Sequence, residues 1–237
     1  MLLFFLLGLL VAVGLSALAD LMLTAQLRRP GRCRMCNGCL RAPQLIVLLR
    51  WLACCQRCGR CGAALPRWRA LVEVGTGLFF ALTWRRHGMS WPLGYALIFG
   101  SLLIVAAITD LEERRVPDAV VAAMAVLSAI AVLHLPTVNL LPTLVGGGVG
   151  FLLFLLIAAI RPGAMGAGDV KLAGAIGLIS GFPGALVSLC LGIVAGGLGA
   201  LILLLTRRVK RSDPIPYAPF LVVGTLLALI SGVPFPR

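Results

Sequence analysis

Long apolar runs recur along almost the whole chain, and they constrain its fold more than any other feature. An α-helix needs about 17 to 25 apolar residues to cross a bilayer, and most of the eight runs reach that length. Charged residues make up only 12% of the chain, too few to cover the surface of a soluble domain. The sequence therefore predicts an all-α, polytopic integral membrane protein with about eight transmembrane helices. The expected spans are residues 2–27, 70–86, 92–110, 117–134, 139–160, 169–181, 184–206 and 216–232.

The basic residues are unevenly distributed over the loops between these spans. Of the 21 Lys and Arg residues, 18 fall in alternate loops, and ten of them lie within residues 28–69. Because cytoplasmic loops are enriched in Lys and Arg, we expect residues 28–69 in the cytoplasm and both termini on the external side. The net charge of +13 is then explained by topology and by anionic membrane lipids, with no need for a nucleic-acid partner.

The first span has a second interpretation. The segment Ala17-Leu18-Ala19 matches the small-residue pattern of a signal-peptide cleavage site. However, no basic residue precedes the apolar run, and Arg28 and Arg29 follow it as a cytoplasmic anchor would. This arrangement favours an uncleaved helix.

Seven of the eight cysteines lie in the predicted cytoplasmic loop, between residues 33 and 61. Two CxxC pairs, Cys33 with Cys36 and Cys58 with Cys61, are separated by 21 residues. Four thiolates at such spacing can surround one tetrahedral zinc ion, and a cytoplasmic location disfavours disulfides. We therefore predict a structural zinc site in this loop.

The remaining cysteines of the loop leave alternatives open. Cys39 extends the first pair into a run that resembles an iron–sulfur motif, but Pro43 occupies the next expected position. Cys54 and Cys55 are bystanders or substitute ligands. A loop without metal, or with another metal, is the alternative to zinc.

Acidic residues are rare, with five Asp and three Glu, and acids next to membrane helices are costly unless they have a function. Asp110 ends one predicted span within ITDLEERRVPDAV, and Asp169 opens another within GAMGAGDVKL. The predicted topology puts both at the cytoplasmic end of their helices. Two carboxylates that share one proton can activate a water molecule and protonate a leaving amine. Taken alone, Asp169 also fits a helix N-cap after a glycine turn.

These motifs, in this order, resemble those of the type IV prepilin leader peptidase/N-methyltransferase family, membrane aspartic proteases of the GxGD class. The two CxxC pairs are similar to the family's cytoplasmic zinc-binding insertion, although residues 41–55 and the extra cysteines depart from its pattern. The other similar segments are LVEVGTGLFFAL (71–82), DLEERRVPD (110–118), GAMGAGDVKLAG (163–174) and IPYAPFL (215–221).

The resemblance implies that Asp110 and Asp169 are the catalytic pair of an aspartic endopeptidase in the bacterial inner membrane. Such an enzyme removes a short basic leader from type IV prepilins or pseudopilins at the cytoplasmic face. Bifunctional members also N-methylate the new terminus with S-adenosylmethionine. We expect Gly166, Gly168 and Lys171 to shape the site, because glycines allow a substrate strand to approach closely.

The implied organisation is a first transmembrane helix (1–27), a zinc-binding insertion (28–69) and a peptidase domain (70–237). A basic leader is repelled by a basic enzyme face, so we expect Glu112 and Glu113 to supply local negative charge for the leader. The alternative function is an ion- or proton-coupled transporter that uses the intramembrane acids as a relay. It predicts acids at the bilayer midplane rather than at one face.

Overall fold

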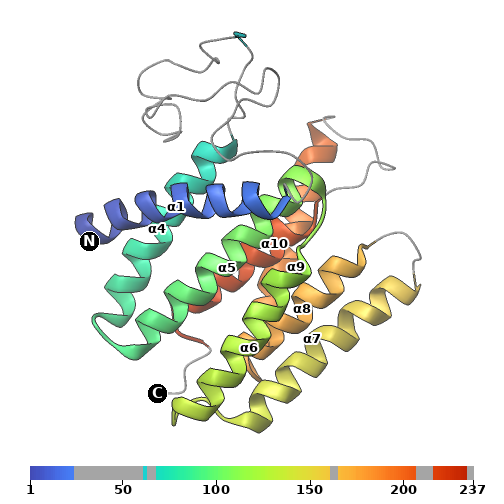
Figure 1. The fold of residues 1–237 in the computed structure, drawn as a ribbon. Helices are drawn as coiled ribbons and strands as arrows, with labels where there is room; N and C mark the ends of the chain where they lie inside the picture. Colours follow the sequence, from blue (N-terminus) through green and yellow to red (C-terminus); the bar gives the residue numbers. More distant parts are fainter. Residues whose placement is uncertain (24–60, 63–67, 161–164, 207–215, 234–237) are drawn as a thin grey trace. The chain divides into compact units, whose positions relative to one another are not determined.

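The structure, a computed structural model, describes residues 1–23, 61–62, 68–160, 165–206 and 216–233. Within these ranges all regular secondary structure is helical, which confirms the all-α prediction for this part of the chain (Figure 1). The helices closely follow the expected spans. They are α1 (Leu2–Leu23), α4 (Trp68–His87), α5 (Trp91–Glu113), α6 (Asp118–His134), α7 (Leu140–Ile160), α8 (Ala167–Ser180), α9 (Gly184–Leu205) and α10 (Ala218–Ser231).

Four of these helices are long and apolar enough to cross a bilayer, judged by length and composition. They are α1, α5, α7 and the Gly184–Ile202 part of α9. The helices α6 and α10 are apolar but shorter. The finding supports a membrane protein with at least these four candidate spans, and the full count of eight remains a prediction.

The chain divides into two compact units, Met1–Arg85 and Arg86–Arg237. In the first unit, α1 and α4 run antiparallel, as three contacts along their length show. Phe4 stacks on Trp84 with ring centroids 5.2 Å apart, and a Cβ on Gly8 would lie 2.8 Å from the Cα of Gly77. At the other end Asp20 forms an ion pair with Arg69, so this acid is held by a cation within its own unit.

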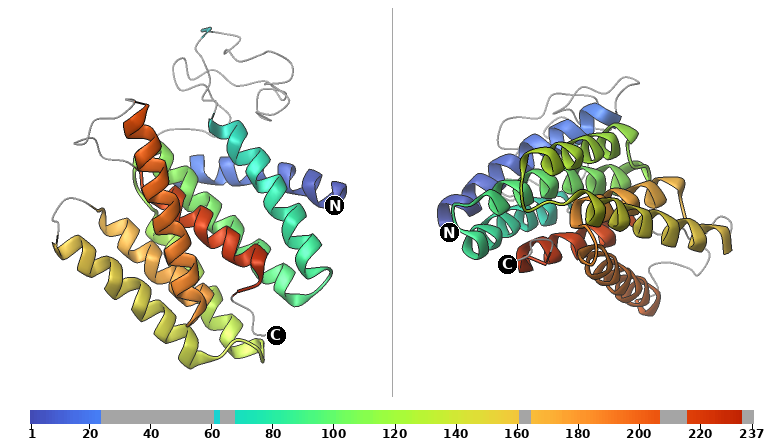
Figure 2. Two further views of the ribbon diagram at one scale, coloured as in Figure 1. Left: turned by 180° about the vertical axis from the view of Figure 1, so that it is seen from behind. Right: turned by 90° about the horizontal axis from the view of Figure 1, so that it is seen from below.

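The second unit is built around α8, which contacts α6, α7, α9 and α10 (Figure 2). Nine of the 14 residues of α8 are buried, which identifies it as the interior helix of this unit. Glycines allow α8 to lie directly against α7. A Cβ on Gly177 would collide with the carbonyl group of Gly146, and a Cβ on Gly150 would collide with the carbonyl oxygen of Ala173. Close backbone contact between small residues is typical of helix packing in membranes.

The helix α8 is also too short to cross a bilayer, since 14 residues extend only about 21 Å. It ends at Gly181, whose φ of 58° a right-handed helix does not accommodate. Its last carbonyl groups accept hydrogen bonds from side chains of other helices. The hydroxyl of Tyr95 donates to the carbonyl of Ile179 at 2.7 Å, and that of Ser128 donates to Leu178 at 3.1 Å. These donors satisfy polar groups that a helix end would otherwise leave unpaired in an apolar environment.

Candidate active site

Asp110 lies in the last turn of α5, and only 5% of the residue is exposed. Its Oδ2 accepts a hydrogen bond from the backbone N–H of Ala218, at the start of α10, over 3.2 Å. The helix ends after Glu113 because Arg114 adopts a left-handed conformation with a φ of 55°. The N–H of Arg114 donates to the carbonyl of Asp110 at 2.8 Å. Asp110 is therefore held through both its backbone and its side chain.

Asp169 lies in the first turn of α8 and is partly exposed. Gly166 is the N-cap residue, in an extended conformation, and its carbonyl accepts the N–H of Asp169 at 3.1 Å. The interpretation of Asp169 as the N-cap is therefore wrong, because Asp169 is the third residue inside the helix. Its Oδ1 is buried and has no hydrogen-bond partner among the described residues. This side chain can accept a proton or a water molecule.

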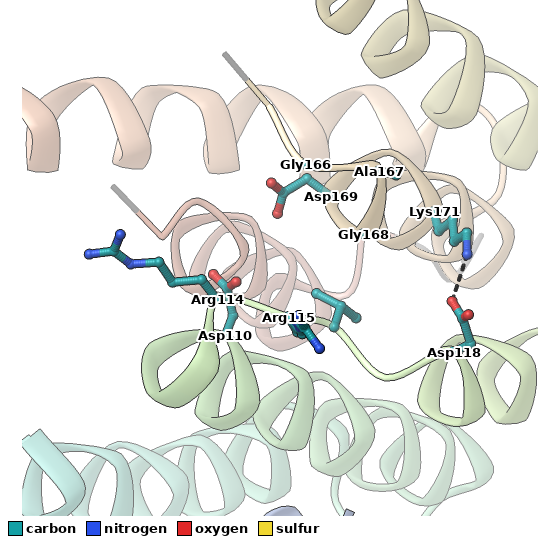
Figure 3. A pocket seen from close by; sticks show the side chains of 10 residues that line it. Asp110, Arg114, Arg115, Asp118, Gly166, Ala167, Gly168, Asp169 and Lys171 are labelled. Atoms are coloured by element: carbon teal, nitrogen blue, oxygen red, sulfur yellow. Dashed lines mark hydrogen bonds and ion pairs between the residues drawn. The ribbon is translucent and has the colours of Figure 1, made fainter. Parts of the chain in front are cut away.

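The two carboxylates face one cavity of about 310 Å³, at the lower end of the roughly 300–1,000 Å³ typical of ligand pockets. Figure 3 shows both directed into the same space, Asp110 from α5 and Asp169 from α8. The two groups are close enough for the charge of Asp110 to act on Asp169. The α5–α6 connection (114–116), Asp118, the first residues of α8 and Lys171 complete the walls. The structure thus brings together the acids that the sequence predicted at one end of the helices.

Gly166 and Gly168 both line this cavity. A Cβ on Gly166 would lie 3.6 Å from Oδ2 of Asp169, and a Cβ on Gly168 would lie 3.4 Å from Cβ of Val116. Both distances are ordinary van der Waals contacts, so the backbone itself does not require glycine here. The missing Cβ leaves room beside Asp169 at Gly166 and beside Val116 at Gly168.

Lys171 lines the cavity two residues beyond Asp169 and donates to Oδ1 of Asp118 at 2.7 Å (Figure 3). This ion pair joins the first turn of α8 to the first turn of α6. Both side chains are well exposed, with 48% of Lys171 and 77% of Asp118 accessible. The sequence marked Asp118 only as the start of a helix, and nothing in it indicated this partner.

Arg114 and Arg115 also line the cavity, and sequence reasoning missed them as site residues. A signal was present, because only four residues separate the end of α5 from the start of α6, so the connection must lie beside Asp110. Glu112 and Glu113, in contrast, are not among the cavity-lining residues. A contact between these glutamates and a leader would lie outside the cavity and stays a prediction.

The predicted zinc ligands Cys33, Cys36 and Cys58 lie outside the described residues, as do Cys39, Cys54 and Cys55. Cys61 is described and exposed. Within the described ranges no group of three or more His, Cys, Asp or Glu side chains is placed to hold a metal ion. The zinc site remains a prediction.

Comparison with known proteins assigns both parts of the chain. Residues 97–201 match the Type IV leader peptidase family, and residues 6–87 match the Bacterial Peptidase A24 N-terminal domain. The first match contains Asp110 and Asp169, and the second contains the predicted cysteine loop. No solved structure matches the chain.

Three curated relatives carry the name prepilin leader peptidase/N-methyltransferase. The protein from Bacillus subtilis (strain 168) is 32% identical over 84% of this chain and 81% of its own length. Those from Stutzerimonas stutzeri and Dichelobacter nodosus are 28% and 30% identical, each over 85% of this chain and 71% of the relative. This similarity does not support a transporter. The chain is an integral membrane protein that belongs to the type IV leader peptidase family.

Proposed function

We propose that this chain is the membrane aspartic endopeptidase that removes the leader from type IV prepilins or pseudopilins, with Asp110 and Asp169 as its catalytic pair. One observation carries the proposal: two carboxylates from different helices face a single cavity in a chain that has few acids. The names of the relatives supply the substrate class.

In the proposed reaction the two carboxylates hold one water molecule and share one proton. One carboxylate takes a proton from the water as its oxygen attacks the scissile carbonyl carbon. The other donates its proton to the amine nitrogen as the C–N bond breaks. A single shared proton is favourable because two charged carboxylates at close range repel each other.

The charge around the cavity supports a separate location for the basic leader. Arg114, Arg115 and Lys171 line the cavity and would repel a basic segment, with Asp118 as the only acid outside the pair in this lining. We place the leader along Glu112 and Glu113 and the scissile bond at the acids. Charge reversal of both glutamates that left cleavage of a basic leader unchanged would overturn this placement.

We place the cavity at the cytoplasmic face of the bacterial inner membrane. The proposal rests on the distribution of the basic residues, which predicts eight spans, a cytoplasmic segment 28–69 and external termini. Anionic lipid headgroups are the expected neighbours of the basic loops. Fusion of a reporter to either terminus and to the 28–69 segment tests this topology.

For residues 28–69 we propose a structural zinc ion held by Cys33, Cys36, Cys58 and Cys61, between the first helix (1–27) and the peptidase domain (70–237). The support is the spacing of the two CxxC pairs. Metal analysis of the purified protein tests it. Cys36→Ser combined with Cys58→Ser should remove one equivalent of zinc, whereas Cys190→Ser should not.

We also propose that the chain N-methylates the new terminus with S-adenosylmethionine as the methyl donor. The relatives' name, prepilin leader peptidase/N-methyltransferase, supports this second activity. Mass spectrometry of the mature product tests it independently of cleavage, since a methylated terminal peptide is heavier by one methyl group.

Co-expression with a prepilin precursor tests the peptidase. We expect the unmodified chain to shorten the precursor, and Asp110→Asn and Asp169→Asn each to lower cleavage by a factor of about 10³ or more. Asp20→Asn is the matched control, because Asp20 also lies near the end of an apolar helix but pairs with Arg69 and is not among the residues that line the cavity. The assignment is wrong if both active-site variants still process the precursor.

A further inference from the structure

The first turn of α10 has one backbone donor to offer, and that donor is bonded to Asp110. Tyr217 is the N-cap residue and makes no capping hydrogen bond with its side chain. Pro219 has no N–H group, and the N–H of Phe220 donates to the carbonyl of Tyr217 at 3.1 Å. The N–H of Ala218 therefore remains, and Oδ2 of Asp110 accepts it.

The position of this donor is fixed by close packing of α10 against α9. A Cβ on Gly224 would collide with the backbone of Gly192, and a Cβ on Gly196 would lie 2.7 Å from Cε2 of Tyr217. The ring of Tyr217 also lies 6.2 Å, centroid to centroid, from that of Phe154. Because these contacts fix how far α10 is displaced along α9, they also fix where the Ala218 N–H points.

Asp169 has no equivalent donor on its buried oxygen. Its Oδ1 lacks a hydrogen-bond partner among the described residues, although the atom is buried. A hydrogen bond from an N–H favours the charged form of a carboxylate, whereas a buried oxygen without a donor favours the protonated form. The surroundings of the two acids therefore differ: a donor from another helix bonds Asp110, whereas Asp169 has a backbone hydrogen bond from Gly166 at its own helix start and one buried oxygen without a partner among the described residues.

We propose that the backbone N–H of Ala218 is a positioning group that assigns the two roles within the pair. It holds Asp110 as the charged member, which takes a proton from the attacking water. Asp169 carries the shared proton and gives it to the leaving amine nitrogen as the C–N bond breaks. The pair then has its proton on Asp110, and exchange with solvent restores the starting state. This inference rests on the peptidase function proposed above.

The alternative is that Asp110 merely caps α10, so that the hydrogen bond contributes to stability alone. Replacing Ala218 by lactic acid distinguishes the two, because a backbone ester removes the N–H without adding volume. The matched control replaces Phe220 by phenyllactic acid, which removes the neighbouring N–H that bonds Tyr217 within the same turn. Both esters delete one hydrogen bond from the first turn of α10, and only the first touches Asp110.

The readouts are thermal unfolding in detergent and the separate kcat and KM for cleavage of a full-length prepilin. We expect similar losses of stability for the two esters. Only the ester at 218 should lower kcat, about tenfold to a hundredfold, with KM unchanged.

The outcomes separate this inference from the function on which it rests. If the unmodified chain leaves the prepilin uncut, the peptidase function fails and this inference fails with it. If the unmodified chain cuts and the two esters have equal kcat values, the peptidase function stands and the positioning role of Ala218 is overturned. A selective loss of kcat at 218 supports both.

Discussion

The two ends that meet at the cavity, the last turn of α5 and the first turn of α8, support their aspartates in different ways. Asp110 lies at the C-terminal end of its helix, where the macrodipole is unfavourable for a negative charge, and a hydrogen bond from α10 offsets this. Asp169 lies in the first turn of its helix, where its carboxylate has a backbone hydrogen bond from Gly166 and one buried oxygen without a partner among the described residues. Asp110 is held by a donor from another helix, and Asp169 by the turn that begins its own helix.

The difference indicates which contacts, when removed, would displace each of the two aspartates. The position of Asp110 depends on one donor from a helix 108 residues further along the chain. The position of Asp169 depends on the fit of α8 against α7, where glycine backbones meet. Substitutions remote from the cavity should therefore affect the α8 side through packing, and the α5 side through hydrogen bonding.

The largest effect is expected for Gly177→Ala, in the C-terminal half of α8 and beyond the residues that line the cavity. The added methyl group would collide with the Gly146 carbonyl, and a backbone cannot move aside as a flexible side chain can. We expect a loss of about 3 kcal/mol in the free energy of unfolding, together with reduced cleavage as α8 shifts. Gly148→Ala is the control, since no atom lies within 4 Å of its Cβ. Equal stability of the two variants would contradict the close fit.

Next in size is the difference between two substitutions of Asp110. Asp110→Ala leaves the buried N–H of Ala218 without an acceptor, so we expect a loss of about 2 kcal/mol in unfolding free energy. Asp110→Asn keeps an acceptor oxygen and should lose less than half of that, although both variants should be inactive. Asp169→Ala should change stability by less than about 1 kcal/mol, because removing a buried oxygen that has no partner among the described residues offsets the loss of the backbone hydrogen bond from Gly166. Thermal unfolding of the three variants in detergent checks the order of these losses in stability. Similar losses for Asp110→Ala and Asp169→Ala would contradict the proposed difference between the two acids.

Much of the fold could be predicted from the sequence because apolar runs specify membrane helices directly. Charge distribution put Asp110 and Asp169 at the same end of their helices, and only the family resemblance predicted that they form a pair. The bond from Ala218 could not, because it depends on how deeply α10 packs against α9. That depth is set by pairs of glycines whose partners no local pattern reveals.

The two ion pairs could not be predicted either, because they also depend on how separate helices pack together. Asp20 and Arg69 are 49 residues apart, and Asp118 and Lys171 are 53 apart, so neither pairing follows from helical spacing. The shortness of α8 could be predicted from the sequence, since the expected span 169–181 is the shortest of the eight. The donors that make such a helix end tolerable, Tyr95 and Ser128, come from other helices and were not visible.

A smaller effect is expected for Tyr95→Phe, which tests the link between the α5 and α8 sides. The variant removes the hydroxyl that donates to the Ile179 carbonyl and keeps the ring. We expect a loss of about 1 kcal/mol in unfolding free energy, because one hydrogen bond to the end of α8 disappears. Ser101→Ala is the matched control, as the Ser101 hydroxyl bonds only the Leu97 carbonyl within its own helix. A loss no greater than that of Ser101→Ala would show that α8 does not need this cap.

The smallest effect on stability is expected for the pair of Lys171 and Asp118, although it lies at the cavity. Both side chains are well exposed, and exposed ion pairs contribute about 0.2–1 kcal/mol, which salt screens. A double-mutant cycle of Lys171→Met and Asp118→Asn should therefore give a coupling energy in unfolding below about 0.5 kcal/mol. Cleavage gives a separate readout, because Lys171 lies two residues from Asp169 in the wall of the cavity. A coupling energy above about 2 kcal/mol would mean that α8 is tied to α6 by charge, and that packing against α7 is not the main support of Asp169.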